Sequence, residues 1–207
     1  MNPLLLTDYY KTEHHKMYPK GTTMIYSNFT PRKSRIDGVN HVVFFGLQHF
    51  ILEYLIKKFN ESFFKKDFLD ILEEYSKHIK LDNYSHIVAL HKLGYLPIEI
   101  KALPEGTLCP IGVPCFTIKN THPDFYWLTN YLETLISAQM WQPITSATIA
   151  YEYKKLLNKY AIETTGSTDG VQWQGHDFSM RGMSSIESAI LSGMGHLLSF
   201  TGTDTIP

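Results

Sequence analysis

The sequence predicts an α/β protein, with a mixed α+β N-terminal domain over residues 1–150 and the start of a βα-barrel-like domain over 151–207. Two observations predict this fold class. Helix-spaced and strand-like segments are mixed in the first part, and near residues 144–166 the pattern changes to strand, loop, helix, strand and loop. Such a βαβ unit joins parallel strands, and one unit alone cannot close a barrel. We therefore expect a truncated barrel domain in the N-terminal portion of a longer protein.

The composition is that of a folded protein, since 43% of the 207 residues are hydrophobic and 19% are charged. This is enough apolar material for one large or two small domains. The net charge of −1 creates no overall field that would attract nucleic acid or an acidic membrane. The sequence has no run of 18 apolar residues and no signal-peptide core, so we expect a cytoplasmic protein. Cys109 and Cys115 fit no common metal or redox spacing and are expected to be free thiols.

Apolar patterning in the N-terminal part predicts two strands, at residues 23–26 and 41–45, and three helices, at 47–59, 67–79 and 84–93. Gly94 is expected to end the third helix, because glycine readily adopts the left-handed conformation that follows many helices. Alternating residues at 98–102 and frequent Pro and Gly residues predict short strands and turns up to residue 118.

Two longer helices are expected next, at residues 124–140 and 145–163. Pro123 is suited to the first turn of a helix, where its missing N–H costs nothing. Pro143 is expected to separate the two helices, because proline in a helix interior removes a hydrogen bond and clashes with the preceding turn.

The predicted βαβ unit places two polar clusters near one another. Its helix is expected to begin at Ser184, with Glu187 completing a capping box, and its strands are expected at residues 171–173 and 198–200. The polar clusters, residues 176–182 and 202–205, would then follow the C-terminal ends of neighbouring parallel strands. This is the edge at which α/β folds bind ligands.

Three residues of these clusters suit a flat, polar, electron-poor ring. Phe178 offers an aromatic face for stacking, and Arg181 can form forked hydrogen bonds to a phosphate or carbonyl oxygen. The Asp204 carboxylate would accept a hydrogen bond from an amide NH₂ and repel a carboxylate. The structural alternatives are a core phenylalanine, a surface cation and a turn-capping aspartate.

The remaining candidates are less specific. His176 and Asp177 are expected to orient the loop through hydrogen bonds to the backbone, with direct catalysis as the alternative. Arg32, with Lys33 and Arg35 beside it, could reach a diphosphate from a flexible loop. No metal site is expected, because the adjacent histidines at 14 and 15 would point in different directions on a helix.

Five segments also carry a resemblance to a known family. Sorted by position, these segments are TDYYKTEHHKMYP (7–19), LPIEIKALPEGTLCPIG (96–112), YWLTNYLET (126–134), HDFSMRGMSS (176–185) and FTGTDT (200–205). They resemble segments that occur in the same order in nicotinamide phosphoribosyltransferase. That family belongs to the type II nicotinate and nicotinamide phosphoribosyltransferases. The chain departs from it at Ser179-Met180, where Gly-Tyr is usual, so the pocket would lose an aromatic wall and bind the ring more weakly.

The resemblance implies roles for individual residues. Phe178 would stack on the pyridine ring, Arg181 would contact ring amide and phosphate groups, and Asp204 would hold the carboxamide nitrogen. Tyr10 would stack on the opposite ring face from the second subunit of a homodimer that shares its active sites, with Asp8 in support.

The resemblance also implies a reaction. The complete protein would join nicotinamide to phosphoribosyl diphosphate, giving nicotinamide mononucleotide and diphosphate in NAD salvage, with Mg²⁺ on the diphosphate and ATP as an optional activator. The family's phosphorylated histidine and phosphate-binding loop have no counterpart in residues 1–207, so we assign no catalytic residue here and expect the chain alone to be inactive. The alternatives are a nicotinate-using relative, or a truncated non-catalytic module that binds pyridines or dimerises.

Overall fold

The computed structural model describes residues 1–206 and divides the chain into two compact units. The first contains Met1–Phe29, Gln48–Ala102 and Phe116–Ala138, and the second contains the remaining stretches. Both units are therefore assembled from separate parts of the sequence. The predicted boundary after residue 150 lies inside the helix α5 (Glu133–Thr165), and the division into domains at that position stays a prediction.

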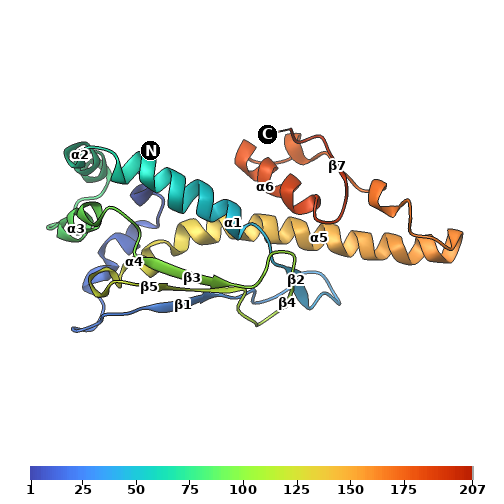
Figure 1. Ribbon diagram of the computed structural model, residues 1–207, viewed down its shortest axis with the longest axis horizontal. Coiled ribbons are helices and arrows are strands. Elements are labelled where there is room, and N and C mark those ends of the chain that lie inside the picture. The colour runs from blue at the N-terminus through green and yellow to red at the C-terminus, as the bar shows by residue number, and fades with distance from the viewer. Residues whose placement is uncertain (207) are drawn as a thin grey trace. The chain divides into compact units, whose positions relative to one another are not determined.

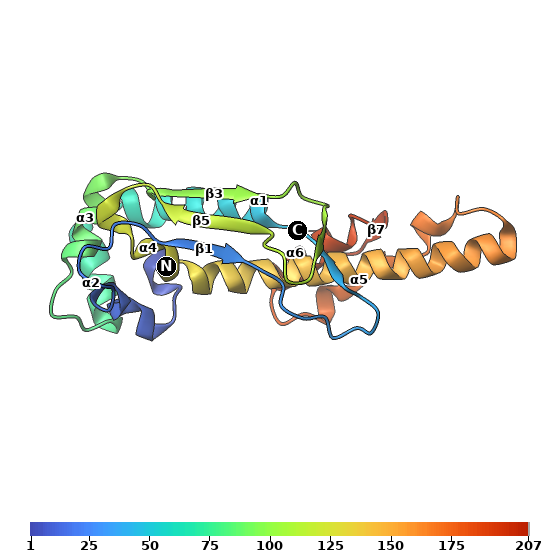
Figure 2. The same cartoon turned by 90° about the horizontal axis from the view of Figure 1, so that it is seen from below.

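The first unit contains a three-stranded antiparallel sheet in the order β1 (Tyr26–Phe29), β5 (Phe116–Asn120) and β3 (Ile98–Ala102) (Figure 2). Alternate residues of β5 are buried, as a sheet with one covered face requires. The alternation at 98–102 correctly predicted β3.

The strand expected at residues 23–26 is wrong in position, since β1 begins only at Tyr26. The physical reason is the side chain of Asn120, whose Oδ1 accepts a hydrogen bond from the Ile25 N–H at 2.8 Å. Its Nδ2 donates to the Thr23 carbonyl at 2.9 Å. A side chain thus satisfies the backbone groups that a strand ladder would have used.

Helices account for most of the rest of the first unit (Figure 1). The predicted helix at 47–59 is confirmed, but only α1 (Leu47–Phe50) is α-helical. It continues as π-helical turns over Ile51–Lys58 and Asn60–Phe64. The helices α2 (Phe68–His78) and α3 (Ser85–Leu93) are also confirmed, and Gly94 ends α3 with a φ of 80°. Short 3₁₀ helices lie at Pro3–Leu5, Tyr9–Lys16 and Pro123–Phe125, and α4 covers Leu128–Tyr131.

Pro143 does not end a helix, contrary to the sequence-based expectation. It lies inside α5, which runs without a break from Glu133 to Thr165. Gly46 explains how the proline ring is accommodated, because a Cβ atom at Gly46 would lie 2.6 Å from Pro143 Cγ. The ring therefore occupies space that any other residue at position 46 would fill.

The second unit contains the antiparallel pair β2 (His41–Val43) and β4 (Leu108–Pro110). The strand expected at 41–45 is thus confirmed over three residues. Cys109 and Cys115 are both buried free thiols, as expected.

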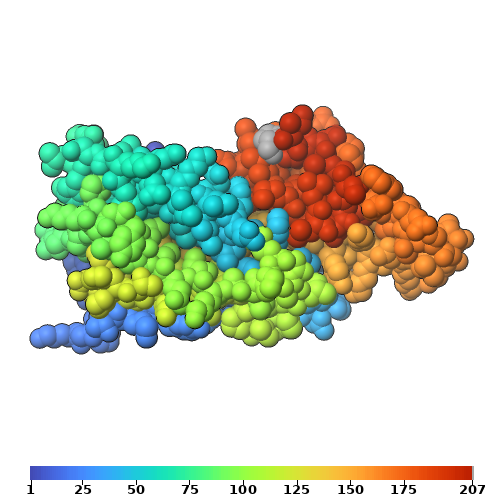
Figure 3. Space-filling model, viewed as in Figure 1, coloured from blue at the N-terminus to red at the C-terminus, as the bar shows by residue number. Residues whose placement is uncertain are grey.

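The second unit also contains the predicted βαβ arrangement. β6 (His176–Asp177) and β7 (Gly202–Thr203) pair in parallel, and α6 (Ile186–His196) connects them. In the space-filling view the C-terminal segment, coloured red, forms a closely packed mass (Figure 3). This arrangement confirms the α/β fold class.

The expected limits of the βαβ unit are wrong in detail. Residues Val171–Trp173 form a 3₁₀ helix, and residues 198–200 form no strand. The helix cap is Ser185, whose Oγ accepts a hydrogen bond from the Ser188 N–H at 3.1 Å, so Ser184 and Glu187 form no capping box. Across residues 1–206, none of the helices combines the length and the apolar character needed to cross a membrane.

Candidate functional site

The polar clusters meet at the end of the parallel strand pair. His176 faces Gly202 and Asp177 faces Thr203 in the register, and the Asp204 N–H donates to the Asp177 carbonyl at 2.9 Å. The clusters therefore lie within these strands and directly after them, not after the strands that we expected. The crossover nevertheless brings the two clusters together, as the sequence predicted.

Asp177 holds this edge together through its buried carboxylate. Its Oδ2 accepts hydrogen bonds from Thr203 Oγ1 at 2.7 Å and from Thr205 Oγ1 at 3.1 Å, and its Oδ1 accepts one from the Ser179 N–H at 3.0 Å. Burial by itself raises the pKa of Asp177, but the hydrogen bonds from Thr203, Ser179 and Thr205 outweigh it, so the pKa lies below its ordinary value. Asp177 thus binds the loop through its carboxylate, in part by a hydrogen bond from the Ser179 backbone N–H, and its role in the site stays a prediction.

Sequence reasoning missed the two threonines that bind Asp177. In an extended segment, successive side chains point to opposite faces. Thr203 and Thr205 therefore share one face, while Asp204 between them points to the other. This alternation in the sequence Thr-Asp-Thr was the available signal.

Phe178, His176 and Asp204 form the exposed part of the site. The Phe178 ring is 66% exposed, and its centroid lies 4.6 Å from that of the His176 ring, at 44° between the planes. His176 Nε2 lies 3.0 Å from Asp204 Oδ1. His176 therefore contacts both an aromatic ring and a carboxylate, a combination of groups that can bind a planar ring carrying an amide.

The two candidate arginines are not part of this contact network. Arg181 ends the 3₁₀ helix Ser179–Arg181 in the loop after β6, and its side chain is exposed. Arg32 is exposed in the segment between β1 and β2. Within residues 1–206, neither guanidinium forms an ion pair, so both are available to an anionic ligand.

A cavity of about 630 Å³ adjoins the site within the second unit. Its wall includes His176, Phe178 and Ser179 from the β6 segment and Tyr153 from α5. His196 of α6 also lines it, and the buried Nε2 of His196 has no hydrogen-bond partner in the described chain. No pattern in the sequence distinguishes His196, because one histidine on a helix with many apolar residues is an ordinary core residue.

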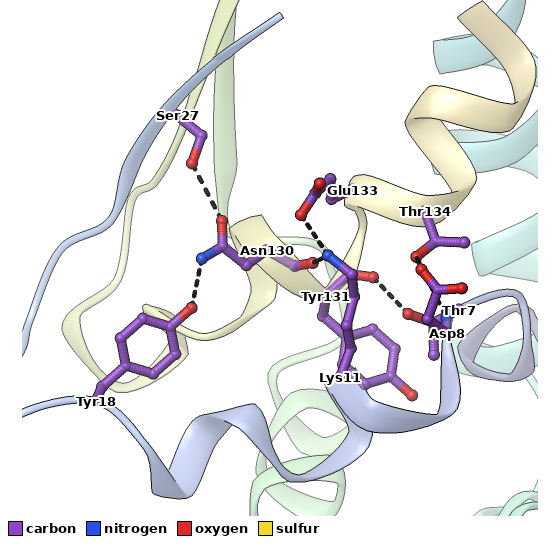
Figure 4. A network of polar contacts seen from close by, with 9 residues as sticks. All are labelled: Thr7, Asp8, Lys11, Tyr18, Ser27, Asn130, Tyr131, Glu133 and Thr134. Carbon is purple, nitrogen blue, oxygen red and sulfur yellow. Dashed lines mark hydrogen bonds and ion pairs between the residues drawn. The ribbon is translucent and has the colours of Figure 1, made fainter.

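Asp8 and Tyr10 lie in the first unit, on the N-terminal segment. Figure 4 shows how this segment is fastened to α4 and the start of α5. Thr134 Oγ1 donates to Asp8 Oδ2 at 2.5 Å, and the buried Lys11 ammonium bonds to the Asn130 carbonyl at 3.1 Å and pairs with Glu133. Tyr10, between these anchors, is 59% exposed. Asp8 therefore acts as an anchor, and the Tyr10 ring, which lies beside His14 with 4.9 Å between ring centroids, stays largely exposed.

The described residues contain no group of three or more His, Cys, Asp or Glu side chains suited to a metal ion.

Comparisons with known proteins bear on what this site binds. Residues 2–100 match the family model for the N-terminal domain of nicotinamide phosphoribosyltransferase. The nicotinamide phosphoribosyltransferase of Acinetobacter baylyi is 49% identical over 217 residues, which cover 100% of this chain and 43% of that protein. The chain matches the N-terminal portion of the nicotinamide phosphoribosyltransferase family.

Two less similar proteins also match this chain. The nicotinamide phosphoribosyltransferase of Xanthomonas campestris is 34% identical over 99% of this chain and 43% of its own length. The crystal structure of human nicotinic acid phosphoribosyltransferase superposes with a TM-score of 0.65 at 18% identity, covering 96% of this chain and 36% of that one. At this identity the likeness concerns the fold alone. The chain thus spans less than half the length of these nicotinamide phosphoribosyltransferase relatives.

Proposed function

We propose that this chain is the base-recognising, N-terminal portion of a nicotinamide phosphoribosyltransferase. The complete protein would join nicotinamide to phosphoribosyl diphosphate, giving nicotinamide mononucleotide and diphosphate in NAD biosynthesis. The observation that carries the proposal is that the exposed Phe178 ring and the Asp204 carboxylate both contact His176 at the β6–β7 edge. The ring offers a stacking face, and the carboxylate accepts from an amide NH₂.

In this reaction the bond between ribose C1 and diphosphate breaks ahead of attack by the ring nitrogen, which leaves an oxocarbenium-like sugar. The protein must hold a weak nucleophile in line and stabilise the departing charge. We assign Phe178 and Asp204 to the first task. Arg181, exposed in the same loop, and Arg32 are suited to phosphate oxygens.

The complete enzyme is also proposed to be a cytoplasmic homodimer, in which Tyr10 covers the second face of the ring. Mg²⁺ would supply charge neutralisation on the diphosphate. ATP would be an activator that binds outside residues 1–207.

A nicotinate-using enzyme is the second candidate, since the human structural relative is named for nicotinic acid. Asp204 argues against it, because two carboxylates facing each other in a partly dry pocket repel by several kcal/mol. The third candidate, a pyridine-binding or dimerisation module without activity, would apply to a protein that lacks the phosphate-binding half.

Replacing Asp204 by serine in the complete protein tests the proposal. Asp204→Ser removes the negative charge and keeps a small polar group, so nicotinamide should lose about 1–3 kcal/mol of transition-state stabilisation. Nicotinate should improve relative to nicotinamide, because the repulsion disappears. The measurement is the ratio of kcat/KM for the two substrates in each form. An unchanged ratio would reduce Asp204 to a turn residue.

A further inference from the structure

The orientation of the Asp204 carboxylate is not set by packing in the proposed site. The side chain is 59% exposed, so packing does not select its rotamer. The backbone is better fixed, because the Asp204 N–H donates to the Asp177 carbonyl at 2.9 Å. Asp177 is in turn held by Thr203 and Thr205. What remains free is rotation of the carboxylate, which decides whether one oxygen faces a bound amide.

His176 restrains that rotation. Its Nε2 lies 3.0 Å from Asp204 Oδ1, the distance of a direct hydrogen bond. A carboxylate held at Oδ1 keeps Oδ2 available to a second donor, such as the NH₂ of a carboxamide. The same imidazole lies against the Phe178 ring, with 4.6 Å between centroids. His176 therefore contacts both groups that would bind the substrate ring, Phe178 and Asp204.

Gly202 on the neighbouring strand leaves space for this imidazole. A Cβ atom at Gly202 would overlap the His176 ring, lying 2.9 Å from its Cε1 atom. A side chain at position 202 would therefore push the ring from its place beside Asp204. The local backbone is thus fitted to the position that His176 takes.

We propose that His176 is a positioning residue that orients Asp204 and sets how strongly the site discriminates an amide from a carboxylate on the pyridine ring. The inference rests on the proposed function and adds to it a residue that need not touch the substrate. It differs from the expected role of His176, which was a hydrogen bond to the backbone.

The test compares three variants of the complete protein with the wild type, using kcat and KM measured separately for nicotinamide and for nicotinate. His176→Ala removes the donor, and His176→Gln keeps a neutral N–H donor. His78→Gln is the matched control, because His78 is an exposed histidine at the end of α2.

We expect His176→Ala to lower the nicotinamide-to-nicotinate ratio about tenfold, the effect of a lost hydrogen bond to a charged group. His176→Gln should restore most of the ratio, because its side chain still carries a neutral N–H donor for Asp204. The control should keep the wild-type ratio.

The inference is overturned if His176→Ala keeps the wild-type ratio, or if His176→Gln lowers the ratio as far as His176→Ala does, while the wild type still makes nicotinamide mononucleotide. That result would leave the proposed function intact. A wild type that makes no nicotinamide mononucleotide would instead overturn the proposed function, and the inference with it.

Discussion

At the scale of single residues, buried polar groups hold the site in shape. The carboxylate of Asp177 is surrounded by hydroxyl and N–H donors, and these keep its pKa low although burial opposes ionisation. Removing one donor leaves a buried charge less well solvated, which costs more than an ordinary hydrogen bond.

Thr203→Val tests the contribution of one donor. Valine has nearly the shape of threonine but cannot donate to Asp177 Oδ2, so the free energy of unfolding should fall by about 1–3 kcal/mol. Thr201→Val is the control, because the exposed Thr201 hydroxyl bonds to the Gln172 carbonyl at 3.2 Å and touches no charge. Urea denaturation measures both variants. Equal losses would show that Asp177 gains nothing particular from Thr203.

His86, in the first unit, makes the stability of the folded state depend on pH. It stacks on His15 with 3.9 Å between ring centroids and meets the edge of Trp127. Burial, aided by the nearby charges of His15 and Lys16, lowers the pKa of His86 from 6.5 to about 3. Between these values the unfolded chain binds the proton more strongly, so the contribution of His86 to stability should decrease as pH falls below 6.5 and level off near 3.

His86→Phe keeps a ring but removes the titrating group. The loss of unfolding free energy between pH 7 and pH 4 should therefore be smaller in this variant than in the wild type, whereas His78→Gln should show the full loss. Thermal unfolding followed over this pH range gives the comparison. The same slope in all three proteins would mean that His86 does not control the acid sensitivity.

At the scale of elements, sequence patterns predicted helices and strands correctly where the segment was long or ended at a clear stop signal. The apolar spacing of α2 and α3, the glycine after α3 and the alternation in β3 each predicted the observed element. The helix end predicted at Pro143 is wrong because Gly46, which is distant in the sequence, leaves space for the proline ring. Tertiary packing of this kind is invisible to a local pattern.

Gly46→Ala should therefore destabilise the protein by more than its backbone strain alone. Gly46 has a φ of 100° and meets Pro143, whereas Gly112, in the same unit, has a φ of 85° and nothing within 4 Å of an added Cβ. Both alanine variants carry strain, and overlap with a packed ring should add about 1–3 kcal/mol for Gly46→Ala. Equal free energies of unfolding for the two variants would mean that the Pro143 contact has no energetic consequence.

The site itself could be predicted in part. The handedness and direction of a βαβ unit were enough to expect the 176–182 and 202–205 clusters to lie together. The strands were misplaced because two-residue strands such as His176–Asp177 and Gly202–Thr203 carry no periodicity. The contact between His176 and Asp204 depends on rotamers and on the space left by Gly202, which only the structure shows.

At the scale of the whole molecule, the chain corresponds to 43% of its relatives from Acinetobacter baylyi and Xanthomonas campestris. The proposed activity therefore belongs to a longer protein and to its assembly. The proposed role of Tyr10 depends on both the complete protein and its assembly, because its exposed ring could cover the pyridine-binding site only if it reaches that site.

A structure of the complete protein would test the shared active site. We predict a dimer in which Tyr10 of one subunit and Phe178 of the other face the same ring-sized space, with each within stacking distance of a bound pyridine, about 4.5–7 Å between centroids. Substituting Tyr10→Ala should raise the KM for nicotinamide. Tyr10 far from every Phe178 in that structure would remove it from the site.

The most direct test of the account is the formation of nicotinamide mononucleotide from nicotinamide, phosphoribosyl diphosphate and Mg²⁺. The complete protein and the isolated 207-residue chain are assayed in parallel, with nicotinate as the competing base. We predict that the complete protein forms nicotinamide mononucleotide and prefers nicotinamide, and that the isolated chain forms none. Turnover by the isolated chain, or a preference of the complete protein for nicotinate, would contradict the account.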